Sequence, residues 1–338
     1  MSWEATSSAS PQKRVVHHAR DRWFLKHEAI LVLLVLGEWF YFNAVGPRFG
    51  SLDNTFDILR HSAEIGLLSL ALTPVILTGG IDLSVGSLLG LCAVVFGKLW
   101  RDAAMSVPMA ALLTLMVGAV AGSVNAAFIS RLKLPALIVT LGTYSLFRGL
   151  AEALTRGVDT FTNFPAGFLF LGQERWLGVP AQTFIFVAVS VAVWIWVHCT
   201  THGRSFRAIG FSVEGTEYAG IPVRRRIASV YIAAGVIAAL ASILYTARLG
   251  QAKADAGTGY ELYAITAVVL GGSSIFGGVG SVHGSLLGVL AIAILNNGLV
   301  HARQPREVAG MLTGLLLITA LSLKPTFEWI ARSLNGRR

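Results

Sequence analysis

The sequence predicts an all-α protein that crosses a membrane about ten times, and three observations support this. Only 13% of the 338 residues are charged, whereas 54% are hydrophobic and the mean hydropathy is +0.66. Soluble domains carry roughly 25% charged residues. No Lys, Arg, Asp or Glu occurs in the 41 residues from Leu262 to Ala302. The 36 glycines suit helices that approach one another closely in lipid.

The predicted spans follow from the length that a bilayer requires. A helix needs about 20 mainly apolar residues to cross the hydrocarbon core. The glycine-rich sequence GGVGS at 277–281 divides the long uncharged run into two spans. We place the ten spans at residues 28–45, 57–78, 83–100, 105–129, 134–151, 180–199, 227–248, 262–276, 282–300 and 307–323.

Basic residues predict the orientation of these spans. Residues 1–27 form a polar tail, residues 28–323 the transmembrane domain, and residues 324–338 a second polar tail. With both tails in the cytoplasm, 16 of the 27 Lys and Arg residues fall on the cytoplasmic side and 10 on the other. Cytoplasmic loops of membrane proteins are enriched in Lys and Arg. The sequence therefore predicts that both termini are inside. The placement of the charges matters more than the net charge of +9, and we expect no nucleic acid as partner.

A lone aspartate interrupts the apolar sequence ILTGGIDLSVGS at 76–87. In the predicted orientation Asp82 lies in a tight cytoplasmic turn between the second and third spans. Gly79 and Gly80 release the backbone from the helix, and the carboxylate then accepts N–H groups at the start of the third span. Two interpretations stay open: Asp82 is a helix cap, or the turn gates the inner mouth of a pathway.

Three Gly-x-x-x-Gly pairs have the spacing of close helix contacts. They begin at Gly86, Gly118 and Gly284. The segments GGIDLSVGSLLG, residues 79–90, and GGVGSVHGSLLG, residues 277–288, match at both ends with equal spacing. They indicate either an internal repeat or shared turn chemistry.

Polar residues within spans are candidates for function by default. Glu38 lies in the first span and either serves as a relay or orients that helix against its neighbours. Thr140, Thr143 and Tyr144 are candidates for lining a pathway, although the threonine hydroxyls can also bond to their own backbone. Arg148 and Glu152 are four residues apart, so we expect them to pair.

The sequence contains no recognisable nucleotide-binding, metal-binding or catalytic motif. No G-x-x-x-x-G-K-[ST] motif occurs, so ATP is not bound by that route. The eight histidines are scattered, and the two cysteines lie in or beside apolar runs. We therefore predict no enzyme activity, no cofactor and no metal site.

The longest predicted cytoplasmic loop covers residues 200–226 and contains a short helix. Ser212 can cap a helix over 213–219, which Gly220 ends in the left-handed conformation before Pro222. The loop also carries five arginines. It either docks a soluble partner or rests on lipid headgroups.

Four stretches together resemble the ribose-type inner-membrane permeases of bacterial ABC importers. TGGIDLSVGS is similar to the family signature, and GRSFRAIGFSVEGTEYAGI resembles the family's coupling loop. PALIVTLGTYSLFRGLA and AVVLGGSSIFGGVGSVHGSLLG also match, so the resemblance spans about 30–323. Within the family, the pattern is most similar to the permeases for rhamnose and for autoinducer 2.

The resemblance implies a mechanism and partners. Two permease chains, identical or sisters, would form one pathway, driven by a cytoplasmic ATPase dimer and supplied by a periplasmic sugar-binding protein. It places the glycine turn beside the pathway. The implied gate and pathway residues are Gly79, Gly80, Asp82, Ser84, Thr140, Thr143 and Tyr144, and the implied coupling residues are Gly203, Arg204, Ser212, Val213, Glu214 and Gly220.

Three alternatives stay open at this stage. A branched-chain amino-acid ABC permease is the nearest. A proton-coupled secondary transporter would use intramembrane acids as relays, and only Glu38 offers itself; a channel is the third. Family members often carry Asn where Ser212 stands and Ala where Gly215 and Thr216 stand. Serine still caps a helix, but Gly215 weakens one by about 1 kcal/mol.

Overall fold

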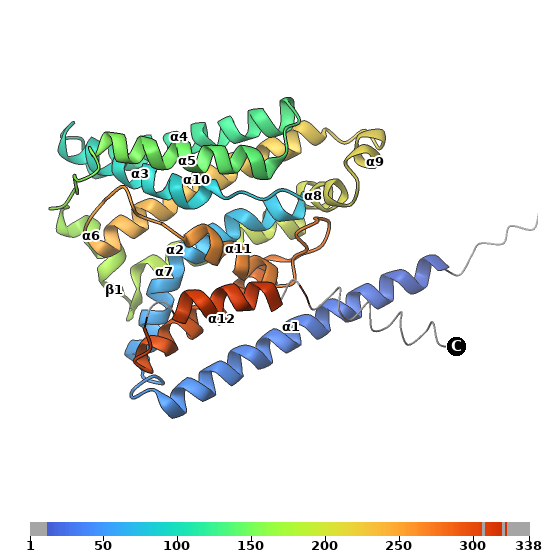
Figure 1. Ribbon diagram of the computed structural model, residues 1–338, viewed down its shortest axis with the longest axis horizontal. Helices are drawn as coiled ribbons and strands as arrows, with labels where there is room; N and C mark the ends of the chain where they lie inside the picture. Colours follow the sequence, from blue (N-terminus) through green and yellow to red (C-terminus); the bar gives the residue numbers. More distant parts are fainter. Residues whose placement is uncertain (1–11, 306–307, 320–321, 323–338) are drawn as a thin grey trace, which may run out of the picture.

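The structure is a computed structural model, and it describes residues 12–305, 308–319 and 322, with side chains from Glu28 onward. The described chain is a bundle of helices that run roughly along one common direction (Figure 1). Helices α4 and α5 lie on one face of the bundle, and α1 lies on the opposite face beside α12. In chain order the elements are α1 (Gln12–Val45), α2 (Leu52–Leu77), α3 (Ser84–Arg101), α4 (Val107–Ala126), the π-helix η1 (Ala127–Arg131), α5 (Ala136–Leu154), α6 (Ala166–Gln173), β1 (Arg175–Trp176), β2 (Val179–Pro180), α7 (Ala181–Trp194), the π-helix η2 (Ile195–Cys199), α8 (Thr201–Phe211), α9 (Val213–Tyr218), α10 (Val223–Leu249), α11 (Tyr260–Leu270) and α12 (Val282–His301).

Helices α2 and α10 form the centre of the bundle. Leu67, Leu68, Leu72 and Ile76 on α2 are fully buried, as is Tyr231 on α10. Around these two helices pack α3, α4, α11 and α12. A helix that is apolar on every side belongs in such an enclosed position.

Glycine pairs set the closest helix contacts, as their spacing predicted. A Cβ at Gly118 or Gly122 of α4 would overlap the α10 backbone, and one at Gly235 of α10 would overlap α4. On α12, a Cβ at Gly284 or Gly288 would overlap the backbone of Gly271 or Ala267. These contacts are available only to residues without a side chain.

Among the described residues, seven helices are long and apolar enough to cross a membrane, which confirms an all-α polytopic membrane protein. Two shorter apolar helices, Tyr260–Leu270 and Val308–Thr319, also match predicted spans, and α2 has 26 residues. The full count of ten spans stays a prediction. The short elements lie at the two ends of the bundle (Figure 1). The end with α6 and the β1–β2 hairpin is called the α6 end, and the end with α8 and α9 is called the α9 end.

Several predicted boundaries were wrong. The span at 262–276 is a helix only to Leu270, because Gly271, Gly272 and the following glycines end it. By contrast, helix α1 begins at Gln12, and its candidate membrane span, Glu28–Val45, matches the predicted first span. The predicted loop 200–226 is mostly helical, since α8 fills residues before Ser212. Residues 1–11 of the predicted N-terminal tail and the whole predicted C-terminal tail, 324–338, lie outside the described residues.

Candidate functional site

The turn after α2 forms as the sequence predicted. Gly79 adopts φ +80°, a left-handed conformation that releases the chain from the helix. Gly80 does not need a positive φ, but a Cβ there would collide with the hydroxyl of Tyr231 on α10. Gly79 therefore provides the left-handed conformation, and Gly80 leaves space for the Tyr231 hydroxyl.

Asp82 is buried, with 2% of its surface exposed, and it caps the start of α3. Its Oδ1 accepts the Ser84 backbone N–H at 2.8 Å and the Ser84 hydroxyl at 2.6 Å. No basic side chain among the described residues forms an ion pair with it. Hydrogen bonds compensate the carboxylate, as a buried charge requires.

A chain of hydrogen bonds extends from Asp82 to two other helices. Asn125 of α4 donates from Nδ2 to Ser84 Oγ at 2.9 Å, and Thr143 of α5 donates to Asn125 Oδ1 at 2.8 Å. Thr140, one turn earlier on α5, donates to the Ile81 carbonyl at 3.0 Å. Every donor points toward the turn, so the network fixes it against α4 and α5.

The predicted pathway residues thus divide into two groups. Ser84, Thr140 and Thr143 are buried in this network, and Thr143 also bonds to the Val139 carbonyl of its own helix. Tyr144 is half-buried outside it. Their lining of a pathway stays a prediction.

A second glycine turn packs against the first. Gly277 has φ +88°, and a Cβ on it would lie 2.8 Å from both Gly79 N and Gly210 Cα. Gly278 donates its N–H to the Leu77 carbonyl at 2.9 Å. Gly210, near the end of α8, touches the same carbonyl and both residues of the second turn. Three segments far apart in sequence therefore meet through glycines.

Helix α9 confirms the predicted capped helix. Ser212 Oγ accepts the Gly215 N–H at 3.0 Å, and Gly220 ends the helix with φ +77°. Val213 and Glu214 are exposed in the first turn. Of the residues implied to position it, Gly203 packs α8 against the backbone of Val197, whereas the Arg204 side chain is exposed. Their coupling roles stay a prediction.

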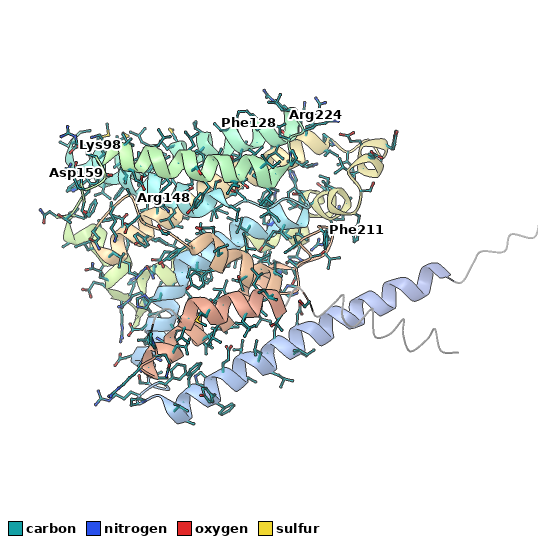
Figure 2. The ribbon with its side chains drawn as sticks, in the orientation of Figure 1. Lys98, Phe128, Arg148, Asp159, Phe211 and Arg224 are labelled. Atoms are coloured by element: carbon teal, nitrogen blue, oxygen red, sulfur yellow. The ribbon has the colours of Figure 1, made fainter. Side chains whose placement is uncertain are left out.

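Large apolar side chains gather at the α9 end. Tyr218 is 92% exposed and Phe276, before the second turn, is 91% exposed, with Phe211 and Val213 about half exposed. Figure 2 shows Phe211 and Arg224 at this end, and Lys98 and Asp159 at the other. Exposed apolar patches of this kind mark interaction sites.

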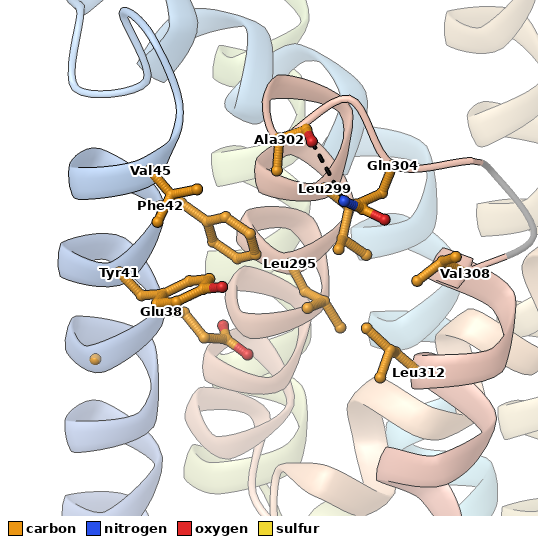
Figure 3. A pocket seen from close by; sticks show the side chains of 11 residues that line it. Glu38, Tyr41, Phe42, Val45, Leu295, Leu299, Ala302, Gln304, Val308 and Leu312 are labelled. Atoms are coloured by element: carbon orange, nitrogen blue, oxygen red, sulfur yellow. Dashed lines mark hydrogen bonds between the residues drawn. The ribbon is translucent and has the colours of Figure 1, made fainter.

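Glu38 lies in a groove between α1, α12 and the helix Val308–Thr319 (Figure 3). Its neighbours there include Tyr41, Leu295 and Leu312. Glu38 Oε2 has no hydrogen-bond partner among the described residues. The groove is remote from the glycine turns in sequence and shares no lining residue with them, so Glu38 is not part of this site.

The predicted ion pair between Arg148 and Glu152 does not form. Arg148 donates instead to the carbonyls of Ala254 and Ala256, at 3.1 Å for the latter. These carbonyls belong to the irregular segment after α10, which the glycines of α3 allow to approach closely. A guanidinium that can bind two carbonyls gains more than from one exposed carboxylate.

Asn125 joins α4 to the turn through hydrogen bonds across helices. Sequence reasoning missed two further residues of the site. Tyr231 and Gly210 carried no motif, and only the three-dimensional contact reveals them. No group of His, Cys, Asp or Glu suited to a metal occurs in the part of the chain that the structure describes.

The geometry is that of a polytopic membrane protein in which two glycine turns meet at one end of the helix bundle, in contact with an exposed helical element. Residues 54–321 match the family model described as "Branched-chain amino acid transport system / permease component". The chain therefore belongs to this family of transport-system permease components.

Relatives match over nearly the whole chain. The autoinducer 2 import system permease protein LsrD of Escherichia coli strain K12 is 37% identical over 329 residues, covering 94% of this chain and 98% of the relative. The LsrD proteins of Escherichia coli strain SMS-3-5 and of Shigella flexneri match with the same identity and coverage. No solved structure matches this chain.

Proposed function

We propose that this chain is a permease subunit of an ATP-driven importer that carries a small polyhydroxylated solute across the bacterial inner membrane. The solute is a monosaccharide, such as ribose or rhamnose, or autoinducer 2. The observation that carries the proposal is the 37% identity to autoinducer 2 permeases over 94% of the chain. The family description also covers branched-chain amino-acid permeases, but the near full-length relatives favour the polyhydroxylated solute.

The proposed topology has ten spans with both termini in the cytoplasm. The α9 end is then cytoplasmic and the α6 end periplasmic. The arginines of α8 and of the start of α10 support this orientation, because basic residues concentrate inside. Lipid surrounds the exposed apolar faces of α4, α5 and α7.

In this proposal α9 and the surrounding apolar side chains dock the ATPase, while a periplasmic sugar-binding protein meets the α6 end. A second permease chain, identical or a sister, completes the pathway. Movement of α8 would reach both glycine turns directly, because Gly210 contacts Leu77 and Gly277. The turn 79–82, with Asp82 and Ser84, is the proposed gate, and Gly203 and Arg204 hold α8 in place.

Uptake by the reconstituted system tests the function. The chain, its ATPase and its second permease are placed in proteoliposomes, and radiolabelled ribose, rhamnose, autoinducer 2 and leucine are each supplied with the binding protein. We expect ATP-dependent uptake of one polyhydroxylated solute. Uptake of leucine alone, or uptake without ATP, would overturn the proposal.

A pair of substitutions at Glu217 tests the docking role of α9. Glu217→Pro places proline in the last turn, where it removes a helical hydrogen bond, and we expect uptake and ATPase association to be lost. Glu217→Ala is the matched control: it removes the same charge but keeps the backbone N–H and favours the helix. Equal effects of both substitutions would reject α9 as the docking element.

Cysteine labelling tests the orientation. In a Cys199→Ser background, Tyr218→Cys on α9 and Val158→Cys at the α6 end introduce exposed thiols. An impermeant thiol reagent added to intact cells should label position 158 and not position 218. The opposite pattern would invert the proposed topology.

A further inference from the structure

A cavity of about 550 Å³, with apolar and polar lining residues, lies between α2, α10, α11 and α12 near the α6 end of the bundle. His61 and Ser62 of α2, Arg248 of α10, Tyr260 of α11 and Asn296 of α12 contribute its polar lining. Small-molecule sites typically enclose about 300–1,000 Å³. The cavity is thus large enough for a monosaccharide-sized solute.

Arg248 organises one wall of this cavity. Its Nε donates to Glu64 Oε1 at 2.7 Å, and its Nη1 lies 3.1 Å from His61 Nδ1. The guanidinium also lies 5.7 Å from the centre of the Tyr245 ring, which packs edge-on against Tyr260 at 6.1 Å. Glu64 is fully buried beside it, so the permanent charge in the wall is already neutralised.

Asn296 lines the cavity and differs from its neighbour Asn297 in the hydrogen bonds of its side-chain amide. Asn297 and Asn54 exchange hydrogen bonds of 2.9 Å in both directions, so that amide is satisfied within the protein. The Asn296 amide has no hydrogen-bond partner among the described residues, and it is only partly buried. Its donors and acceptor remain available to a solute.

The position of these groups indicates that water fills the cavity. Ionisable and amide side chains inside a membrane face the bundle interior or an aqueous cavity, because lipid cannot satisfy them. Arg248 lies in the last turn of α10 and Tyr260 begins α11. This part of the polar lining therefore lies near the α6 end, which is the periplasmic side in the proposed topology.

We propose that this cavity is an entry site for a neutral, polyhydroxylated solute, with Asn296 as a hydrogen-bonding residue and the Tyr245–Tyr260 pair as an apolar wall. The inference rests on the proposed function and adds the binding residues to it. A neutral wall without spare charge suits hydroxyl groups better than a carboxylate or a phosphate. Amides and tyrosines supply both donors and acceptors for hydroxyls.

Thiol labelling tests the aqueous cavity and its occupation. In a Cys199→Ser background, Asn296→Cys should react with an impermeant reagent added outside intact cells. Saturating ribose, rhamnose or autoinducer 2, whichever the wild type accumulates, should slow this reaction about threefold or more. Val191→Cys, on an exposed apolar face of α7, is the lipid-facing control and should not react. An unreactive Asn296→Cys, or a reaction that the solute leaves unchanged, would overturn the site.

A pair of leucine substitutions separates solute binding from folding. Asn296→Leu should slow uptake at subsaturating solute roughly three- to tenfold, as expected for one neutral hydrogen bond, without lowering the unfolding temperature. Asn297→Leu breaks the amide pair with Asn54 and should lower the unfolding temperature. Wild-type uptake by Asn296→Leu, or a loss of stability equal to that of Asn297→Leu, would overturn the role of Asn296.

The two proposals can fail separately. If the wild-type complex accumulates none of the polyhydroxylated probes, the proposed function fails and the entry site fails with it. If the wild type transports one of them while Asn296→Cys is unprotected, only the entry site fails.

Discussion

The two similar segments at 79–90 and 277–288 share a backbone design but lie in different surroundings. Each begins with a left-handed glycine, Gly79 or Gly277, and continues into a helix with a Gly-x-x-x-Gly contact. In the first segment Gly79 is exposed, but Asp82 and Ser84 are buried, and hydrogen bonds link this segment to α4 and α5. The second borders the exposed Phe276. Similar local sequence therefore gives similar turns, while the residues between the glycines decide what each turn contacts.

The caps differ in the same way. In the first segment Asp82 binds the N–H of Ser84, two residues later. Its counterpart in the second is Gly280, and the cap moves one position to Ser281, which accepts the Gly284 N–H at 3.0 Å. A buried acid thus belongs to only one of the two turns, and four sets of substitutions test whether this difference matters.

The largest effect is expected at the contact between the turns. Gly277→Val places a side chain against the backbone of Gly79 and Gly210 in a left-handed conformation, and we expect a loss of about 4 kcal/mol or more. Gly278→Ala meets the ring of exposed Phe211, which can move, so its loss should be much smaller. Thermal unfolding of the purified chain measures both. Equal losses would show that the turns do not depend on their backbone contact.

The next effect concerns the space beside Gly80. Gly80→Ala should cost roughly 1–3 kcal/mol, because the new methyl group overlaps the Tyr231 hydroxyl. Tyr231→Phe removes that hydroxyl and should recover most of the loss in the double variant. If the double variant stays as unstable as Gly80→Ala, the clash lies elsewhere. If it is stable and assembled but does not transport, the turn is a gate.

Two substitutions at Asp82 distinguish its role as a helix cap from the role of its negative charge. Asp82→Ala leaves the Ser84 N–H unpaired and should cost about 1–3 kcal/mol. Asp82→Asn keeps an acceptor without the charge and should cost less. Unfolding and uptake are measured on the same preparation. Normal uptake by Asp82→Asn would assign the residue to capping alone, whereas a stable variant without uptake would assign its charge to gating.

The smallest effect is expected in the second turn. Ser281→Ala removes its cap and should cost about 1 kcal/mol. Phe276→Ala, at an exposed side chain, should change stability by less than about 0.5 kcal/mol, but it should weaken ATPase association. A loss at Ser281 greater than at Asp82 would reverse the comparison between the segments.

The sequence predicted the helical class, the turn at Gly79 and the cap at Ser212 because these depend on local chemistry. Apolar runs, left-handed glycines and capping serines act within a few residues. The end of α11 was mispredicted because hydropathy does not distinguish a helix from an apolar irregular segment. The Asn125 bridge and the Tyr231 contact depend on how α4 and α10 pack, and no local pattern encodes that packing.

The contact of Gly210 with both turns has a thermodynamic consequence under the proposed roles. Coupling between two sites is reciprocal: if one ligand changes the binding affinity for a second ligand by some factor, the second changes the affinity for the first by the same factor. If ATPase docking on α9 favours one arrangement of the turns, a solute that favours the same arrangement must tighten the ATPase on α9 by the same factor. Measuring ATPase affinity with and without solute therefore reports, from the cytoplasmic side, how the solute changes the state of the gate.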